Sequence, residues 1–416
     1  MGRLHYGILG AGNIFFGWGN GSGHLPGCPW VIEEGRLAAI CDINRDNLNK
    51  AASATRRLYL DKAAQHRAAG REDLAQLLEN DCNSLKLYSS LEEMLQSEKL
   101  DFTVIITPCE HHAEAIRKIL AAGCHILCEK PLVRTWLEAQ ALADCVSNSD
   151  CIFLYGENLI YADPFHDVRK LIAKGEIGEL DTVRIPFSIS KPGNDNYANG
   201  RVGALLDNGI HAITLAWHII GFDYVPQTVK ALHPDGIATR IGKRLIDGEA
   251  QEFTVEDYAN FAVLFVHPQT GHWVSAILEA SWSFGDMTAF KATGNKGEIS
   301  IKDGKIMVED AYGNSHPRNI SHGGFLNSEP PPGYGGHPQQ LLNMIRLVRK
   351  NAVPLCDIRK AAESLAIAQS AYLSEARGKT AVTLDEFKQY AGKFSHTDEL
   401  LEELLSKGIN KGGLRA

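Results

Sequence analysis

The sequence predicts an α/β protein with two domains: an N-terminal doubly wound parallel sheet, then an α+β domain with an open, largely antiparallel sheet. The chain has 416 residues, which is too long for one ordinary hydrophobic core. Its first part alternates short apolar runs with helical patterns, as parallel sheets do. From about Asp181 the apolar runs are separated by short Gly, Asn or Asp turns, which favours antiparallel pairing.

The composition excludes several classes of function. The chain is 44% hydrophobic and 22% charged, which is typical of a globular protein. The net charge of −8 argues against nucleic acid or an anionic membrane as the main partner. No apolar run approaches the roughly 18 residues needed to span a bilayer, and the N-terminus lacks a signal-peptide pattern. A partner that is a small molecule is therefore expected.

Nine cysteines without a C-x-x-C pair indicate buried free thiols in a reducing compartment, so a cytoplasmic location is expected. A zinc site would need clustered Cys or His at ligand spacing. The histidine pairs considered are His111–His112 and His211/His218, and neither is a recognisable ligand set. The sequence therefore predicts no bound metal.

A glycine turn and an acid mark a dinucleotide site in the first strands. Residues 4–9 are a predicted strand followed by Gly10-Ala11-Gly12, and the strand 36–41 ends in Asp42. Glycines let the backbone approach a pyrophosphate, and a helix N-terminus adds N–H donors. A carboxylate at position 42 would accept hydrogen bonds from ribose hydroxyls and repel a 2′-phosphate, which favours NAD over NADP.

The turn departs from the simplest dinucleotide fingerprint. Phe15 stands where a third small residue would be, and Asp42 lies 32 residues after Gly10 (42 − 10), against about 20 in the fingerprint. The excess contains glycines at 17, 19, 21 and 23. Either the first helix is delayed, or a glycine loop covers the phosphates; an irregular surface loop explains the pattern equally well.

The rest of the first domain repeats the pattern of strand, helix and strand. Residues 44–98 are predicted to be helical, with a solvated surface insertion at about 56–80. A strand over 100–107 and a helix over 113–122 lead to CHILCEKPL, residues 124–132, whose first half is a buried strand. Lys130 follows the end of that strand, at the sheet edge where ligands bind in open α/β sheets.

The second half combines helices with an antiparallel meander. Asp207 and His211 lie four residues apart in a predicted helix over 203–221, where a carboxylate could orient an imidazole for acid–base chemistry. A helix cap and a core histidine explain the pair without function. The other expected elements are strands at 151–155, 181–190, 260–267, 273–282 and 287–301, helices at 136–146, 164–173, 339–350 and 360–377, a loop at 329–336, and a charged helical tail from 384.

Four motifs in order resemble the Gfo/Idh/MocA oxidoreductase family: GILGAGNI (7–14), TPCEHH (107–112), CEKPL (128–132) and LLDNGIH (205–211). The resemblance covers most of residues 1–383. It implies a Rossmann domain over 1–133 and a substrate-binding and oligomerisation domain over 134–383, which the helical tail over 384–416 follows. It also implies NAD(P)-linked oxidation or reduction at a sugar or cyclitol hydroxyl, and a homodimer or homotetramer.

The resemblance carries roles onto matching residues. Lys130 would hold the reacting oxygen, His211 would be the general base, and Asp207 would orient the substrate or the imidazole. Asn158 would line the substrate pocket with these three. The residues implied at the cofactor are Gly10, Gly12, Asn13, Ile14, Asp42, Thr107, Pro108, His112, Glu129 and Lys130.

The leading hypothesis is an NAD-dependent dehydrogenase or reductase of a polyhydroxylated substrate, with Lys130 and the pair of Asp207 and His211 converging from different domains. One alternative keeps NAD bound and uses transient oxidation to cleave a glycosidic bond. Another is a ligand-sensing regulator on the same scaffold. An intact catalytic set favours an enzyme, because a sensor needs no general base. The sequence leaves the substrate itself open.

Overall fold

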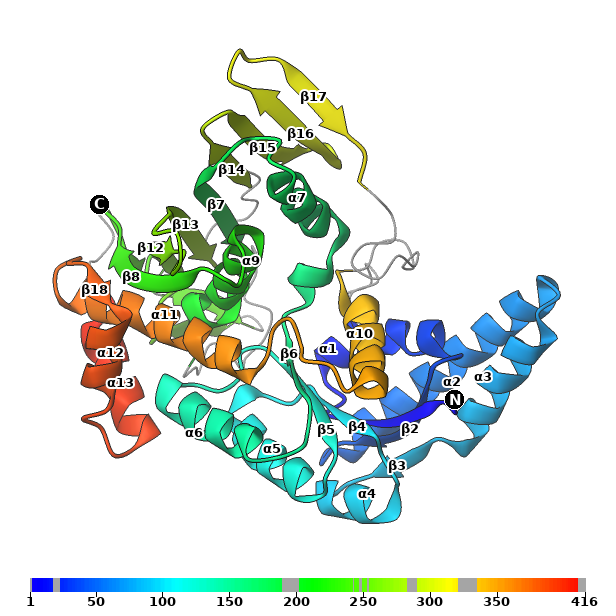
Figure 1. Ribbon diagram of the computed structural model, residues 1–416. Coiled ribbons are helices and arrows are strands. Elements are labelled where there is room, and N and C mark those ends of the chain that lie inside the picture. The colour runs from blue at the N-terminus through cyan, green and yellow to red at the C-terminus, as the bar shows by residue number, and fades with distance from the viewer. Residues whose placement is uncertain are drawn as a thin grey trace. The chain divides into compact units, whose positions relative to one another are not determined.

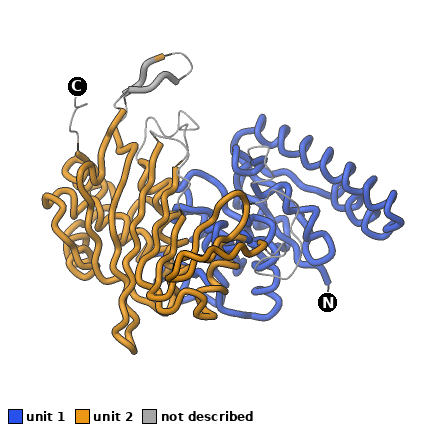
Figure 2. Tube along the Cα trace, turned by 90° about the horizontal axis from the view of Figure 1, so that it is seen from above, with its two compact units in different colours: residues 1–133, 141–163, 322–359 blue, residues 134–140, 164–321, 360–416 orange. Residues whose placement is uncertain are grey.

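A computed structural model describes residues 2–17, 23–188, 202–241, 243–246, 249–252, 254–282, 290–320 and 335–410. The chain divides into two compact units (Figure 2). Unit 1 comprises residues 1–133, 141–163 and 322–359, and unit 2 comprises residues 134–140, 164–321 and 360–416. Within the described ranges, no helix is both long and apolar enough to cross a membrane.

Unit 1 is built on a six-stranded parallel sheet in the order β3-β2-β1-β4-β5-β6 (Figure 1). The central strand β1 pairs in parallel with β2 on one side and with β4 on the other. The order in which successive strands are added to the sheet therefore reverses at β1. The predicted doubly wound sheet is confirmed. Its strands are β1 (Leu4–Leu9), β2 (Gly35–Cys41), β3 (Lys86–Tyr88), β4 (Phe102–Ile105), β5 (His125–Glu129) and β6 (Phe153–Gly156).

The helices of this region match the predicted ones in type, with different bounds. They are α2 (Arg45–Ala68), α3 (Glu72–Ser84), α4 (Leu91–Ser97), α5 (His112–Ala121), α6 (Trp136–Ser147) and α10 (His337–Lys350). Asn44 caps α2 by accepting from the backbone N–H groups of Asp46 and Asn47. The predicted insertion at about 56–80 forms two helices with a largely exposed face, but it also has a buried face, because Tyr59 and Leu78 of the helix pair α2 and α3 lie in the core.

The first helix is short rather than delayed. Helix α1 (Asn13–Phe16) ends at Gly17, and the short 3-10 helices η1 (Leu25–Gly27) and η2 (Pro29–Val31) follow. Phe15 is fully buried in the core of unit 1, so the large residue at this position serves packing. Of the predicted glycine loop, positions 19 and 21 lie outside the described residues.

Unit 2 contains a sheet in the order β17-β16-β15-β14-β7-β13-β12-β8-β18, with β9 beside β12. The sheet is mostly antiparallel, as predicted, but β13 and β7 pair in parallel. The prediction of a single strand over 287–301 is wrong. A turn at residues 295–296 separates two strands, which pair as an antiparallel hairpin. The strands are β7 (Leu180–Ser188), β8 (Val225–Ala231), β9 (Ile237–Ala238), β12 (Tyr258–Val266), β13 (Trp273–Ser281), β14 (Lys291–Gly294), β15 (Gly297–Lys302), β16 (Lys305–Asp310), β17 (Ser315–Arg318) and β18 (Val382–Thr383), with a separate hairpin of β10 (Lys243–Ile246) and β11 (Glu249–Glu252).

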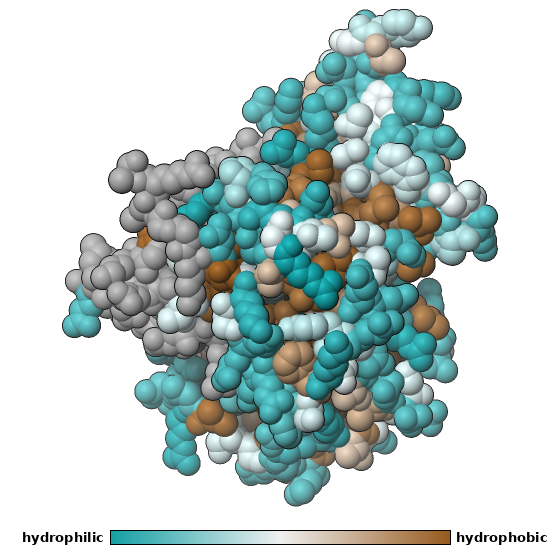
Figure 3. All heavy atoms as spheres, turned by 90° about the vertical axis from the view of Figure 1, so that its left-hand side faces the viewer, coloured by the Kyte–Doolittle hydropathy of each residue, from teal (hydrophilic) through white to brown (hydrophobic). Residues whose placement is uncertain are grey.

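One face of this sheet is buried and the other is partly exposed. Along β12, Phe261, Val263 and Phe265 are fully buried, while the alternating residues between them are half-buried. Figure 3 shows hydrophobic residues scattered among hydrophilic ones on one side of the molecule. The predicted burial of a sheet face in a dimer or tetramer stays a prediction.

Helices cover the buried face, and α9 (Ile210–Ile220) packs on β7 and β13. The other helical elements of the second half are η4 (Asn158–Tyr161), α7 (Asp163–Ala173), η5 (Leu205–Gly209), α11 (Ile358–Ala376), α12 (Leu384–Ala391) and α13 (Thr397–Lys407). Thr383 and Glu386 form a capping box at the start of α12. Most of the predicted 329–336 loop, and residues 411–416, lie outside the described residues.

Candidate cofactor and catalytic residues

The glycine turn after β1 is shaped by one residue that must be glycine. Gly10 has φ = +103°, and a Cβ there would lie 3.0 Å from the carbonyl group of Ile106. A Cβ on Gly12 would meet no protein atom within 4 Å, so the turn has open space beside it. Asn13 and Ile14 begin the four-residue helix α1 directly after this turn. The backbone here can therefore be approached closely by a ligand.

Asp42 fixes the turn from the end of β2. Its Oδ2 atom accepts a hydrogen bond of 2.7 Å from the backbone N–H of Ala11, and Oδ1 accepts one of 2.8 Å from the N–H of Asn44. The amide of Asn47 donates to Oδ2 at 3.4 Å, a contact that sequence reasoning missed. Two strand ends are thus joined by one carboxylate, which stands where a ribose would be recognised.

The turn after β4 is held by a buried histidine. His112 places Nε2 at 2.7 Å from the carbonyl oxygen of Thr107 and Nδ1 at 2.9 Å from that of Leu132. Burial lowers the pKa of this imidazole, although the two carbonyl contacts favour its charged form. His112 therefore ties the Thr107–Pro108 turn to the segment after Lys130. Its position supports a structural role at the cofactor edge.

The hydroxyl of Thr107 is buried and has no hydrogen-bond partner in the described part of the chain. A buried polar atom without a partner is costly, and a bound ligand can satisfy it. Together with the open space at Gly12 and the carboxylate of Asp42, this hydroxyl fits a dinucleotide bound along the carboxyl ends of β1, β2 and β4.

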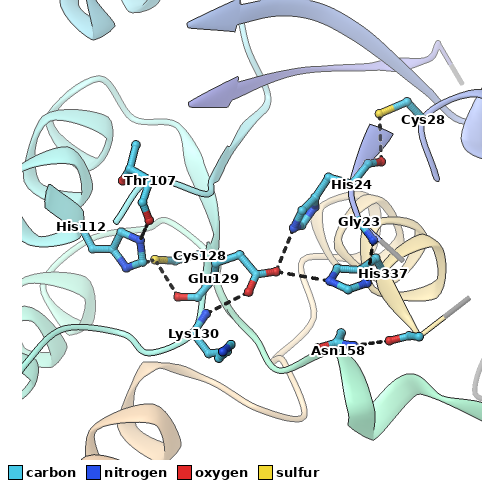
Figure 4. Close-up of polar contacts among 11 residues, drawn as sticks. Gly23, His24, Cys28, Thr107, His112, Cys128, Glu129, Lys130, Asn158 and His337 are labelled. Carbon is cyan, nitrogen blue, oxygen red and sulfur yellow. Dashed lines mark hydrogen bonds and ion pairs between the residues drawn. The ribbon is translucent and has the colours of Figure 1, made fainter. Parts of the chain in front are cut away.

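Glu129 sits at the end of β5 between two histidines that the sequence analysis did not single out (Figure 4). Its Oε1 atom lies 2.8 Å from His24 Nε2 and 3.8 Å from His337 Nε2. Burial raises the pKa of this carboxyl, but the hydrogen bond from His24 and nearby positive charge outweigh burial and hold the pKa at about 2. Glu129 is therefore an anion inside the protein.

Lys130 is half-buried and follows β5 directly. Its backbone N–H donates to Glu129 Oε2 at 3.2 Å, so the carboxylate also fixes the start of the Lys130–Pro131 segment. Asn158 begins η4 at the end of β6, and its side-chain amide donates to the carbonyl oxygen of Gly335, just before α10. Sequence patterns placed both residues at strand ends, and the structure does so too.

In unit 2, Asp207 lies in η5, a single stretch of π-helix that leads into α9. Its Oδ2 atom accepts a hydrogen bond of 3.1 Å from the indole N–H of Trp282. The N-terminal cap of η5 is Ala204, so the alternative that Asp207 caps the helix does not hold. π-helical insertions often occur at functional sites. The regular α-helix expected over 203–221 is wrong at this point.

The neighbours of Asp207 pack the motif closely against β13. A Cβ on Gly209 would lie 2.8 Å from Leu205 Cδ1 and 3.4 Å from the Cβ of Ala280, which explains the glycine in D-x-G-x-H. The amide of Asn208 donates to the carbonyl oxygen of Ser281 at 3.2 Å. His211 is 8% exposed, and its ring lies 5.0 Å from the ring of Phe187.

Comparison with known proteins identifies the family. Residues 4–157 match the Gfo/Idh/MocA model described as an oxidoreductase family with an NAD-binding Rossmann fold, and residues 165–300 match the family's C-terminal domain. The chain belongs to the Gfo/Idh/MocA family. The resemblance inferred from the four motifs is confirmed.

Two relatives illustrate the range of the family. Inositol 2-dehydrogenase of Rhizobium meliloti is 27% identical over 230 residues, covering 55% of this chain and 65% of that protein. D-glucoside 3-dehydrogenase of Escherichia coli is 28% identical over 156 residues, covering 36% of this chain and 44% of that protein. The matched region thus spans about half the length of these relatives.

Solved structures share the fold across the whole chain. Levoglucosan dehydrogenase, in complex with NADH and L-sorbose, has a TM-score of 0.70 at 17% identity, covering 93% of this chain and 100% of that chain. Aldose-aldose oxidoreductase from Caulobacter crescentus, complexed with glycerol, has a TM-score of 0.67 at 20% identity, covering 92% and 99%. At such identities the comparison shows the fold alone.

Proposed function

We propose that the protein is an NAD-dependent dehydrogenase or reductase that acts on a CH–OH group of a sugar, glycoside or cyclitol. The observation that carries this proposal is membership of an NAD-binding oxidoreductase family combined with Lys130, Asp207 and His211 at their motif positions. Relatives named as dehydrogenases of inositol and of glucosides support the substrate class.

The proposed roles follow from the chemistry of each side chain. When bound, the nicotinamide supplies the hydride acceptor or donor. His211 takes the hydroxyl proton as general base, and the ammonium group of Lys130 stabilises negative charge on the reacting oxygen. Asp207, held by Trp282, positions the substrate or the imidazole. Asn158 is proposed to line the substrate pocket from unit 1.

The direct test mixes purified protein with NAD and a panel of aldoses, glycosides and inositols, and follows NADH absorbance. Net NADH formation with at least one member is expected. Release of an aglycone without net NADH would instead establish the NAD-retaining glycosidase. Binding of NAD and sugars without turnover in either direction would support a sensor and contradict the dehydrogenase.

Cofactor choice gives a second prediction. We expect the protein to bind NAD more tightly than NADP, because the carboxylate of Asp42 would repel a 2′-phosphate. Replacing Asp42 with Asn should narrow the preference for NAD over NADP by about 5- to 30-fold, since a charge–charge repulsion of about 1–2 kcal/mol is removed. Fluorescence titration with both dinucleotides measures it, and Asp46→Asn, at an exposed acid in the first turn of α2, is the control. An unchanged ratio of the two dissociation constants would remove Asp42 from cofactor selection.

A further inference from the structure

We propose that His24, Glu129 and His337 bind a divalent transition-metal ion, with zinc as the best match. The three side chains come from segments far apart in the chain: the start of η1, the end of β5 and the start of α10. All three belong to unit 1. In this cluster, called the His-Glu-His cluster below, the potential ligand atoms all lie within 4.8 Å of one another (Figure 4).

The ligand types suit zinc. Two imidazoles and one carboxylate form a common three-ligand set for this ion, which leaves one coordination position for water or substrate. Bonds of roughly 2.0–2.2 Å in a tetrahedral site place ligand atoms about 3.3–3.6 Å apart. The contacts of Glu129 Oε1 with His24 and His337, 2.8 and 3.8 Å, bracket that separation. Shifts of less than about 1 Å at each side chain would therefore admit the ion.

Burial and charge favour a site rather than a chance contact. His24, Glu129 and His337 are 3%, 6% and 5% exposed, so the ligands are already desolvated. Glu129 offers one carboxylate oxygen, Oε1, toward both histidines, as a shared cation site requires. The second oxygen, Oε2, accepts from the backbone N–H of Lys130 and is thereby oriented.

One hydrogen bond, from the backbone N–H of Gly23 to His337, would have to be lost when the metal binds. The backbone N–H of Gly23 donates to His337 Nδ1 at 3.4 Å, which places the proton of the neutral ring on Nε2, the atom that faces Glu129. Metal binding through Nε2 moves this proton to Nδ1 or releases it. The Gly23 contact is at the long limit of a hydrogen bond, so its loss costs little.

The metal would tie the chain after the glycine turn to β5 and α10. It would thus stabilise the segment between β1 and β2. This role does not depend on the proposed reaction, because it concerns the folding of unit 1 and the metal content of the protein.

The test uses full-length protein without an affinity tag, stripped with a chelator and titrated with Zn²⁺ and with Co²⁺. We expect one tight equivalent by elemental analysis and calorimetry, the visible spectrum of tetrahedral Co²⁺, and a rise in thermal midpoint with added Zn²⁺. His24→Gln and His337→Gln should each weaken binding by at least about 100-fold, more than loss of an outer-shell partner does. His218→Gln is the matched control, because His218 is also buried, at 5% exposure, but lies in unit 2.

Two results would overturn the proposal. Absence of any tight equivalent would show that the His-Glu-His cluster only pairs a buried carboxylate with two imidazoles. Equal binding by the wild type and both cluster variants would place the metal elsewhere, for example on surface histidines or the exposed Cys145. Circular dichroism of each variant confirms that lost binding does not come from unfolding.

Discussion

Replacing Lys130 with alanine is expected to lower kcat by about 10²–10⁴-fold while NAD binding is retained. The ammonium group would stabilise charge on the reacting oxygen. Its loss should therefore raise the free energy of the transition state and leave the affinity for NAD nearly unchanged. The hydrogen bond to Glu129 Oε2 should survive, because the backbone N–H of residue 130 donates it and alanine keeps that group. Single-turnover kinetics with saturating NAD, together with a NAD titration by fluorescence, separate the two effects.

The matched control is Lys118→Ala. Lys118 lies in α5 of the same unit and pairs with Glu92 and Glu114 on the surface, where an ion pair contributes little. The Lys118→Ala variant should leave both kcat and NAD binding unchanged. Normal turnover by the Lys130 variant would remove this residue from catalysis, and loss of NAD binding would reassign it to the cofactor alone.

The parts of the site that local pattern determines were predictable. Gly10, Asp42 and Lys130 each follow a short apolar run, and in parallel sheets such positions meet at one edge. The glycine at position 10 is required by its left-handed backbone and by the approach of Ile106, both consequences of the turn that the sequence predicted. The pattern of Asp207 and His211 likewise placed them at the start of one helix.

What depends on tertiary contact was not predictable. Strand β3 has only three residues at the sheet edge, two of them exposed, so it carries no apolar signal. The π-helix at Leu205–Gly209 has no sequence signal that distinguishes it from the start of an α-helix, and it packs closely on β13. His24 and His337 lie far from Glu129 in the sequence and show no ligand spacing, so only the fold brings these three side chains together.

A buried acid beneath the π-helix gives the second large prediction. Glu256 is fully buried, and its Oε1 atom accepts hydrogen bonds of 2.9 Å from the backbone N–H of Leu205 and 2.7 Å from the hydroxyl of Tyr372. Oε2 is buried and has no hydrogen-bond partner among the described residues. Burial raises the pKa of this carboxyl to about 7, and the charge of Asp257 adds to the shift.

The sign of the effect on stability follows from where the proton is held. Between pH 4.5 and about 7 the folded protein keeps a proton on Glu256 that the unfolded chain has released. The free energy of unfolding therefore falls as pH rises through this window, by about 3 kcal/mol, and levels off above it. Below pH 4.5 both states are protonated and the group contributes no slope.

Glu256→Gln removes this dependence, because glutamine copies the neutral form at every pH. The variant should match the wild type near pH 4.5 and exceed its stability by up to about 3 kcal/mol at pH 8, measured by denaturant unfolding followed by circular dichroism. Glu179→Gln, at an exposed acid of the same unit, should leave the profile unchanged. Parallel pH profiles for Glu256→Gln and the wild type would mean that Glu256 stays ionised in the folded protein.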